Sequence, residues 1–168
     1  MKTISLTQGK VTVVDDDVYE WASQHKWFAI YHHDNWYAVR NVRIEGALSR
    51  NKRQIIERLH RVIVGAVRGQ KTDHKDGDGL NNRRYNLRVC TQTQNLRNQK
   101  LRRSNTTGYK GVVYDKATDK FRAQIGVDGR KIALGSFESP AEAARSYDAA
   151  AIKYFGEFAK PNSILSRL

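Results

Sequence analysis

Residues 73–99 read DHKDGDGLNNRRYNLRVCTQTQNLRNQ, and this stretch decides the fold of the middle of the chain. The Asp73-His74 pair at its start is predicted to end a strand, and the polar, glycine-containing run that follows is typical of a loop. Leu87–Cys90 is predicted to form a second strand, and a short helix is predicted to begin near Thr91. The stretch therefore predicts a strand, a loop, a strand and a helix, with a carboxylate and an imidazole where the first strand ends.

These residue types suit the hydrolysis of a phosphodiester. That reaction needs a nucleophilic water, stabilisation of charge on the phosphate and help for the leaving oxygen. An imidazole such as His74 can deprotonate water near neutral pH. A carboxylate together with an amide oxygen can hold a hard cation such as Mg²⁺ and leave its other positions to water and phosphate. An Asp-His pair in a loop is nevertheless common by chance, so the pair alone does not establish catalysis.

The stretch closely resembles the ββα-metal motif of HNH endonucleases, particularly the phage and intron-borne homing type. Leu59–Val64 (LHRVIV) resembles the helix that precedes the motif in that group, so the resemblance covers roughly residues 59–99. It implies that His74 is the general base, and that Asp73 and Asn95 are ligands of one divalent metal ion, Mg²⁺ with Mn²⁺ as the alternative. It also implies that Asn86 braces the loop and orients His74. The third letter of the motif is then Asn rather than His, and the cysteine pairs of some members are absent.

Several polar residues of this region also have a structural interpretation. Asn86 and Asn95 would then be only turn and helix-cap residues. Asp76 and Asp78 lack the spacing and the final Glu of an EF-hand, and we interpret them as turn residues. His60 and Asn98 are assigned structural or accessory roles. The single cysteine, Cys90, is predicted to lie in the core, and it excludes an intrachain disulfide and a cysteine-based zinc site.

The chain carries a large positive charge. It has 168 residues with 30 Lys and Arg against 17 Asp and Glu, which gives a formal net charge of +13. Such a surplus favours a polyanionic partner, although an RNA-binding protein or a protein attracted to anionic membranes would share it. No acidic residue occurs between Asp78 and Asp115. The cations of that interval, which would repel one another unless neutralised, are predicted to contact DNA phosphates: Arg83, Arg84, Arg88, Arg97, Lys100, Arg102, Arg103 and Lys110.

The N-terminal region, residues 1–58, is predicted to be mostly β. Trp27–Val42 is rich in aromatic and β-branched residues and is interrupted by His32–Asn35, which predicts a hairpin with a polar turn. The three tryptophans, Trp21, Trp27 and Trp36, are predicted to lie in the core. The basic loop Ser49–Arg53 would either touch a phosphate backbone or be only a solvated loop.

The sequence of residues 108–162 predicts a separate module. Its strand candidates are Tyr109–Tyr114, Phe121–Val127 and Lys131–Phe137, with an Asp128-Gly129 hairpin turn before the third. A helix follows: Ser139 can cap it, Pro140 suits its first position, and Gly156 ends it after Phe155. Ala144, Tyr147, Ala151 and Tyr154 are expected on one face. The predicted divisions are a β-rich region (1–58), a nuclease motif (59–99), a basic linker (100–107), this module (108–162) and a tail (163–168).

The module resembles the DNA-binding domain of plant APETALA-type, ethylene-response transcription factors. The residues that carry the resemblance are GYKGV (108–112), LGSF (134–137) and EAARSYDAAAIKYFG (142–156). In that family a three-stranded sheet backed by a helix lies in the major groove. The family's contact positions imply DNA contacts by Lys110, Gln124 and Lys131, and strand parity and charge add Arg122. Val113, Asp115 and Ala133 replace the usual Arg, Arg and Trp, so plant target specificity is not implied. A protein-binding sheet is the alternative.

The sequence thus predicts an α+β protein with a β-rich N-terminal region, a ββα-metal centre and a three-stranded antiparallel sheet packed on one helix. Its predicted function is metal-dependent cleavage of double-stranded DNA near a site located by the C-terminal module. The alternatives are a catalytically silent DNA-binding regulator and a basic RNA- or ribosome-associated protein. We expect a monomer or dimer with no membrane partner and no obligatory protein partner. We expect it in the cytoplasm, that of the bacterial host if a phage encodes it, since no apolar span or signal peptide is evident.

Overall fold

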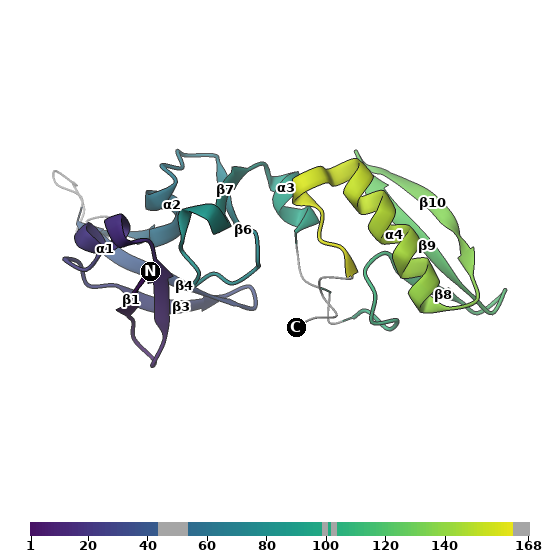
Figure 1. Cartoon of the computed structure of the whole chain (residues 1–168), viewed down its shortest axis with the longest axis horizontal. Helices are drawn as coiled ribbons and strands as arrows, with labels where there is room; N and C mark the ends of the chain where they lie inside the picture. Colours follow the sequence, from purple (N-terminus) through teal and green to yellow (C-terminus); the bar gives the residue numbers. More distant parts are fainter. Residues whose placement is uncertain (44–53, 99–100, 102–103, 163–168) are drawn as a thin grey trace. The chain divides into compact units, whose positions relative to one another are not determined.

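The computed structural model describes residues 1–43, 54–98, 101 and 104–162. The chain forms two compact units, Met1–Gln92 and Thr93–Leu168 (Figure 1). Strands and helices occur in both, which confirms the predicted α+β class. The predicted loop Ser49–Arg53 and the predicted phosphate contacts Lys100, Arg102 and Arg103 lie outside the described residues.

Two small sheets build the N-terminal part of the first unit. β1 (Lys2–Ser5) pairs with β2 (Val11–Val14), and β4 (Asn35–Arg43) lies between β3 (Phe28–His32) and β5 (Gln54–Arg58). All of these pairings are antiparallel. The predicted hairpin is confirmed, with His33 and Asp34 at its turn in the left-handed region at φ 48° and 58°.

A helix that the sequence analysis missed follows β2. Residues Asp16–Ala22 form α1, and the strands β1 to β5 still make the described part of residues 1–58 mostly β, as predicted. Asp16 and Asp17 lie in its first turn, where carboxylates interact favourably with the positive end of the helix dipole. Val18 and Ala22, four residues apart, are fully buried. Tertiary packing of this short apolar stripe therefore stabilises a helix that local propensity alone would leave marginal.

The core of the first unit joins the N-terminal elements to the central motif. Trp27 is 3 % exposed, packs with Val14, Val18 and Leu59, and donates from Nε1 to the carbonyl of Ala22 at 2.9 Å. The core prediction is thus confirmed for Trp27. Trp21 packs half-buried against the core, and Trp36 is half-buried with the ammonium of Lys10 4.8 Å from its ring centroid.

The central motif follows the predicted order. α2 (Leu59–Ile63) leads to β6 (Lys71–His74), a loop closed by the 3-10 helix η2 (Arg84–Asn86), β7 (Leu87–Cys90) and α3 (Gln92–Arg97). The antiparallel β6–β7 register places Asp73 opposite Arg88 and His74 opposite Leu87. The loop is attached to β2, because Val13 N–H donates to the carbonyl of Leu80 at 3.0 Å and Asn82 N–H donates to that of Val13 at 2.8 Å.

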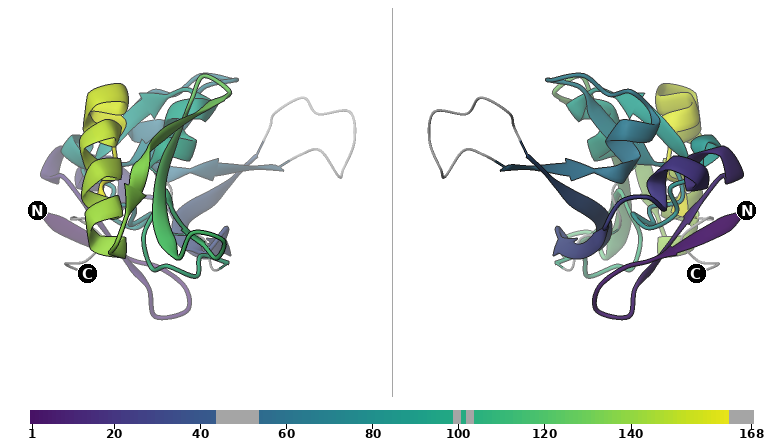
Figure 2. Two further views of the ribbon diagram at one scale, coloured as in Figure 1. Left: turned by 90° about the vertical axis from the view of Figure 1, so that its right-hand side faces the viewer. Right: turned by 90° about the vertical axis from the view of Figure 1, so that its left-hand side faces the viewer.

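The second unit contains a sheet and a helix in two layers. β8 (Val112–Asp115), β9 (Lys120–Val127) and β10 (Arg130–Phe137) form an antiparallel sheet with β9 in the middle. α4 (Pro140–Phe155) covers one face of it, as Figures 1 and 2 show, and the 3-10 helix η3 (Gly156–Phe158) follows. The predicted cap is confirmed, since Ser139 Oγ accepts from the N–H of Glu142 at 3.2 Å. β8 begins at Val112 rather than at the predicted Tyr109, because a turn centred on Gly108 and Gly111, both at positive φ, precedes it.

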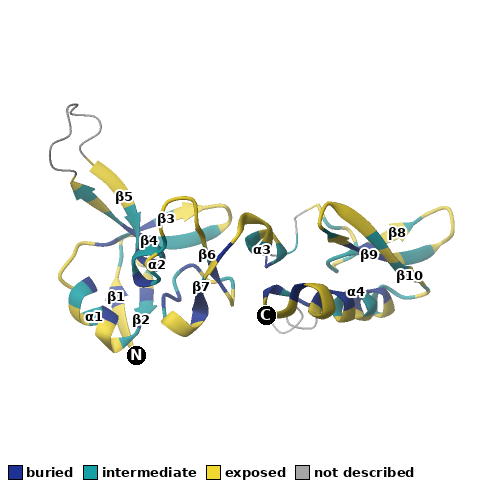
Figure 3. Cartoon of the chain, turned by 90° about the horizontal axis from the view of Figure 1, so that it is seen from above, coloured by how far each residue is buried: buried dark blue, intermediate teal, exposed yellow. Residues whose placement is uncertain are grey.

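The buried side of α4 differs from the prediction at one position. Ala144, Tyr147 and Ala151 are buried against the sheet as predicted, but Tyr154 is 40 % exposed. Phe155, four residues after Ala151, takes the inner position, because the 3.6-residue period carries the apolar stripe to it. Figure 3 shows the buried residues along one side of this helix and exposed residues along the other.

We expect Gly111→Ala to destabilise the second unit. Gly111 has φ 77°, and an added Cβ would clash with the ring of Tyr147. Overpacking of this kind costs about 1–3 kcal/mol, and the left-handed backbone adds roughly 1 kcal/mol for a residue with a Cβ. Urea unfolding followed by circular dichroism measures the loss.

Gly126→Ala is the matched control, because Gly126 lies in β9 with open space where its Cβ would be. Trp21, Trp27 and Trp36 all belong to the first unit, so tryptophan fluorescence monitors that unit separately. Equal unfolding midpoints for the two alanine variants would contradict the packing of Tyr147 on Gly111.

Candidate functional site

Two consecutive residues of β6, an aspartate and a histidine, are buried in the β6–β7 pair. Asp73 and His74 are the last two residues of β6, and each is 6 % exposed. They are held at this point because the ladder to β7 and the bond from Lys75 N–H to the carbonyl of Asn86, at 2.8 Å, close the loop behind them. The structure therefore places the two most specific predicted residues together at the start of the loop.

Asp73 forms a buried ion pair with Arg88. The Nε and Nη2 atoms of Arg88 donate to Oδ2 of Asp73 at 2.9 and 2.7 Å, and both side chains are less than a tenth exposed. Charge-assisted bonds of this kind are strong, and removal of either partner from a buried ion pair is destabilising. From the sequence, Arg88 is predicted to contact DNA phosphates. Its guanidinium instead lies against the carboxylate that the family resemblance identifies as a metal ligand.

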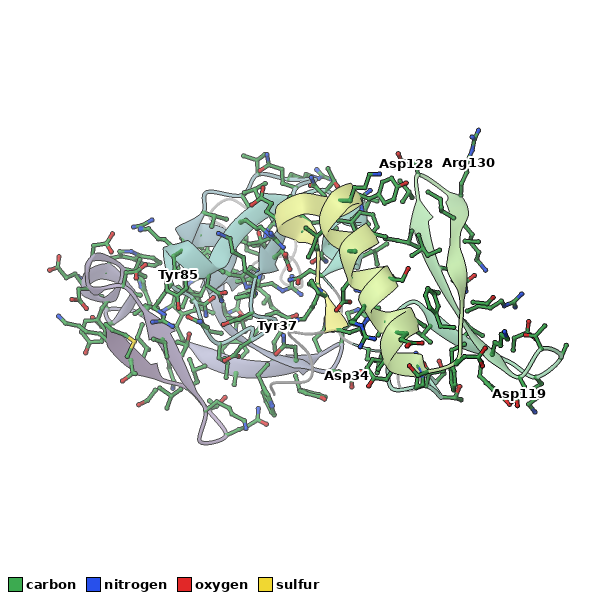
Figure 4. All side chains as sticks on the ribbon, turned by 45° about the vertical axis from the view of Figure 1, so that its right-hand side comes forward. Asp34, Tyr37, Tyr85, Asp119, Asp128 and Arg130 are labelled. Atoms are coloured by element: carbon green, nitrogen blue, oxygen red, sulfur yellow. The ribbon has the colours of Figure 1, made fainter. Side chains whose placement is uncertain are left out.

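His74 lies in an aromatic pocket of the first unit. Its ring packs edge-on against His60 of α2, with centroids 5.0 Å apart, and 6.1 Å from the ring of Tyr37, which is labelled in Figure 4. The Nε2 atom is 3.1 Å from Oδ1 of Asn82, whose side chain is fully buried. Burial lowers the pKa of His74 below the ordinary histidine value, and the bond to Asn82 and nearby carboxylates partly oppose that shift. The ring is therefore neutral near pH 7 and can accept a proton.

Asn86 fastens the loop from within. Its Nδ2 donates to Oδ1 of Asp76 at 2.9 Å and to the carbonyl of Asn81 at 2.8 Å, and its Oδ1 accepts from the N–H of Asp76 at 3.1 Å. These bonds support the bracing role that the resemblance implied. The side chain seen against the ring of His74 is that of Asn82, which the sequence analysis did not single out. No local signal marks Asn82, because a paired asparagine in a polar loop usually only forms a turn.

The two aspartates of the loop have turn geometry. The N–H of Asp78 donates to Oδ1 of Asp76 at 2.8 Å, and the N–H of Leu80 donates to Oδ1 of Asp78 at 2.9 Å. Oδ2 of Asp76 accepts from Nδ2 of Asn81 at 2.6 Å. Carboxylates that bond the backbone two residues ahead are typical of Asx turns, which supports the interpretation of both as turn residues.

His60 is a buried neighbour of the candidate base. It is 6 % exposed, its Nδ1 has no hydrogen-bond partner among the described residues, and its ring also packs on Tyr37 at 5.6 Å. Burial, followed by the proximity of His74, holds its pKa well below the ordinary value. His60 is therefore a neutral wall of the pocket.

The other predicted metal ligand lies in the second unit. Asn95 is half-buried in α3, and Asn98, one residue beyond Arg97, is 7 % exposed. The ligand role of Asn95 and the accessory role of Asn98 stay predictions. No group of three or more His, Cys, Asp or Glu side chains suited to a metal occurs among the residues that the structure describes. The carboxylate of Asp73 is an oxygen ligand of the kind that suits a hard cation.

Acidic residues distant in sequence neutralise part of the basic run. Arg84 donates to the carboxylate of Asp17 at 2.5 Å and lowers the pKa of that carboxyl, and its N–H is bound to Asp15. The guanidinium of Arg97 lies 4.4 Å from the ring centroid of Phe155 and 3.6 Å from Asp128. These intramolecular partners explain how the cations coexist.

Arg83 is similarly engaged. Its guanidinium lies 4.6 Å from the ring centroid of Tyr85, and its Nε donates to Oδ1 of Asn81 at 2.9 Å. Phosphate contacts by Arg83, Arg84 and Arg97 stay predictions, and a bound phosphate would share these side chains with their protein partners.

Three of the four residues predicted to contact DNA from the C-terminal module share one face of the sheet. Along β9, Ala123 and Ile125 are buried towards α4, so Arg122 and Gln124 face the opposite way. The register pairs Lys131 with Gly126, which places Lys131 on the same outer face. Asp119 and Asp128 mark the β8–β9 and β9–β10 turns at opposite ends of this sheet (Figure 4). Arg122 is 59 % exposed and lies 3.5 Å from Asp115.

Lys110 differs from the other three. Its Nζ donates to the carbonyl of Arg97 at 2.6 Å, and burial, reinforced by the charge of Lys160, lowers its pKa to about 8. The side chain therefore connects the turn before β8 to the end of α3, and its location favours a structural role over the predicted DNA contact.

We expect Lys110 to make the stability of the second unit increase with pH. Its folded-state pKa of about 8 lies below the ordinary value of 10.5, so the unfolded chain binds more protons between these values. The free energy of unfolding therefore rises by about 2 kcal/mol from pH 8 to pH 10 on account of this group. Lys110→Met should remove that rise in urea unfolding, whereas Lys116→Met, at an exposed site, should keep it. Parallel pH curves for the two variants would contradict the lowered pKa of Lys110.

Comparison with known proteins finds two kinds of relative, viral proteins and plant transcription factors. The chain is 32 % identical over 112 residues to an uncharacterized HNH endonuclease of Acanthamoeba polyphaga mimivirus, which covers 63 % of this chain and 57 % of that protein. It is 34 % identical over 64 residues to Protein 3.8 of Escherichia phage T7, covering 38 % of this chain and 53 % of that protein. The chain thus spans little more than half the length of these relatives.

A different similarity connects the chain to plant regulators. It is 52 % identical over 50 residues to an AP2/ERF and B3 domain-containing transcription factor of Arabidopsis thaliana, covering 30 % of this chain and 14 % of that protein. No family model matches the chain, and no solved structure matches it. No helix among the described residues has the length and apolar character needed to cross a membrane. The chain is distantly homologous to an HNH endonuclease and to AP2/ERF DNA-binding domains.

Proposed function

We propose that this protein is a metal-dependent endonuclease that nicks double-stranded DNA near a site located by its C-terminal sheet. The observation that carries the proposal is the buried Asp73-His74 pair at the end of β6. A loop braced by Asn86 follows the pair, and β7 and α3 follow the loop. The partial similarity to a viral HNH endonuclease supports the same function.

The chemistry follows from the neutral imidazole. His74 takes a proton from a water molecule, the water oxygen forms a bond to phosphorus, and the bond to the 3′ oxygen breaks. Asp73 and Asn95 would hold one divalent cation, Mg²⁺ with Mn²⁺ as the alternative, and that cation would stabilise negative charge on the phosphate. Arg88 fixes the carboxylate of Asp73, so that the oxygen ligand is oriented before substrate arrives. One such centre serves one strand at a time.

The C-terminal unit supplies the affinity for duplex DNA. Its sheet presents Arg122, Gln124 and Lys131 on the face opposite α4, and a sheet surface of this size can enter the major groove. The similarity of this part of the chain to AP2/ERF domains supports the assignment. The same observation favours one alternative, a DNA-binding regulator without catalysis, which a nicking assay separates from the nuclease.

We expect the protein to nick supercoiled plasmid DNA in the presence of Mg²⁺ and not in its absence. His74→Ala should lower the nicking rate by a factor of about 10²–10⁴, because it removes the general base. The affinity for DNA should stay unchanged, since phosphate contacts elsewhere provide it. Gel assays of nicking and of binding, carried out on the same preparations, measure the two effects.

His32→Ala is the matched control, because His32 is exposed at the end of β3 and should leave the rate unchanged. No nicking by the unmodified protein with Mg²⁺ or Mn²⁺, combined with normal duplex binding, would favour the regulator. Tighter binding of structured RNA than of duplex DNA at equal salt would favour an RNA-associated protein.

We expect the double variant Arg122→Ala and Lys131→Ala to bind DNA with a weaker salt dependence. If both cations contact phosphates, the slope of log K against log[salt] falls by about 0.9 for each, or roughly 1.8 together. Lys116→Ala, which removes an exposed charge between β8 and β9, serves as the control. An unchanged slope together with unchanged discrimination between sequences would exclude this face of the sheet as the DNA-binding surface.

A further inference from the structure

A buried chain of hydrogen bonds connects His74 to β2. Nε2 of His74 is 3.1 Å from Oδ1 of Asn82, and Nδ2 of Asn82 donates to Oγ1 of Thr12 at 2.7 Å. The hydroxyl of Thr12 donates in turn to the carbonyl of Leu80 at 2.8 Å. Thr12 and Asn82 are both fully buried, although they lie 70 residues apart in the sequence.

The far end of this chain determines its direction. The carbonyl oxygen of Leu80 can only accept a hydrogen bond, so the hydroxyl of Thr12 must donate its proton there. The oxygen of Thr12 then accepts from the amide nitrogen of Asn82. The carbonyl of Gly79, 3.5 Å from the same nitrogen, also favours an N–H₂ group at that position. The amide oxygen of Asn82 must therefore face His74.

An amide oxygen beside an imidazole nitrogen selects one tautomer. A neutral imidazole carries its proton on one nitrogen and a lone pair on the other. Because Oδ1 of Asn82 only accepts, the nitrogen that faces it, Nε2, must carry the proton. Nδ1 of His74 then has the lone pair.

We propose that Asn82 and Thr12 are positioning residues that hold His74 in the tautomer protonated on Nε2, so that Nδ1 is the atom that takes the proton from the attacking water. This role rests on the proposed nuclease function. The O–H bond of water breaks as its proton passes to Nδ1, the water oxygen bonds to phosphorus, and the 3′ oxygen leaves with the electron pair of the broken bond. Asn82 stays hydrogen-bonded to Nε2–H and stabilises the imidazolium that forms.

The backbone keeps this arrangement rigid. Thr12 precedes Val13, whose N–H and carbonyl are bonded to Leu80 and Asn82, so Thr12 cannot move away from the loop without breaking that bridge. The rings of His60 and Tyr37 pack against His74 from α2 and β4. Orientation of the base thus depends on a strand that contributes no group to the reaction.

The protonated nitrogen can be observed directly. Two-bond ¹H–¹⁵N correlation spectra of protein labelled with ¹⁵N-histidine, recorded at about pH 8, above the ordinary histidine pKa, distinguish the two tautomers. The His74 signals are assigned by their loss in His74→Gln. We expect Nε2–H in the unmodified protein, and a spectrum showing Nδ1–H would overturn the proposal without any variant.

Substitutions at Thr12 test the relay through activity. Thr12→Val keeps the shape but removes the hydroxyl that orients Asn82, and Thr12→Ser restores the hydroxyl. We expect Thr12→Val to show mixed tautomers of His74 and a lower kcat at unchanged KM and DNA affinity, and Thr12→Ser to behave as the unmodified protein. A wrong tautomer costs up to about 10⁴ in rate in Ser-His-Asp enzymes, so a loss of ten-fold or more is expected here.

The outcomes separate this proposal from the function on which it rests. Retention of the Nε2–H tautomer and of full kcat in Thr12→Val would overturn the role of Thr12. An unmodified protein with the Nε2–H tautomer but no nicking activity would contradict the nuclease function and leave the assignment of the tautomer supported. Nicking activity together with an Nδ1–H tautomer would support the nuclease function and contradict the assignment of the tautomer.

Discussion

The bridge between β2 and the loop at Leu80–Asn82 is the constraint on which the candidate site depends. Two backbone hydrogen bonds join Val13 to Leu80 and Asn82, and the hydroxyl of Thr12 adds a third connection to Leu80. A polar loop that contains two glycines would otherwise sample many conformations. Fixing its backbone in one of them costs conformational entropy. Because Thr12 and Asn82 are fully buried, their polar groups must keep their partners, and the loop is held in one conformation.

Many of the positive side chains in this protein find their partners through the fold, in elements that are distant in the sequence. Positive residues accumulate between Asp78 and Asp115, yet several of them have acidic or aromatic partners from other elements. Asp17 of α1 binds Arg84, Asp73 of β6 binds Arg88, and Asp128 lies near Arg97. The net charge of +13 still favours association with a polyanion. Individual arginines, however, serve the structure of the protein as well as any contact with DNA.

Much of the fold could be predicted from local patterns. Leu87–Cys90 forms the predicted strand, and α4 begins after its serine cap and ends before Gly156 as expected. Caps, turns and glycines act over a few residues, so the sequence itself displays them. The helix Asp16–Ala22 was missed because its stability comes from the burial of Val18 and Ala22 in a core built from distant segments. The inner position of Phe155 was missed because the apolar stripe was followed to Tyr154 instead.

The sequence by itself determined the residue types at the end of β6, the order of elements around them and the parity that puts Arg122 and Gln124 on one side of a strand. The side of a strand or helix on which a residue lies can be predicted from the sequence, because side chains repeat every two residues in a strand and every 3.6 residues in a helix. Only the tertiary structure decided that Arg88 pairs with Asp73, that Lys110 is half-buried against the carbonyl of Arg97 and that Asn82, hydrogen-bonded to Thr12, contacts His74. Such contacts join residues that are far apart along the chain, or side chains that point towards the interior. Which residues meet depends on how the backbone packs.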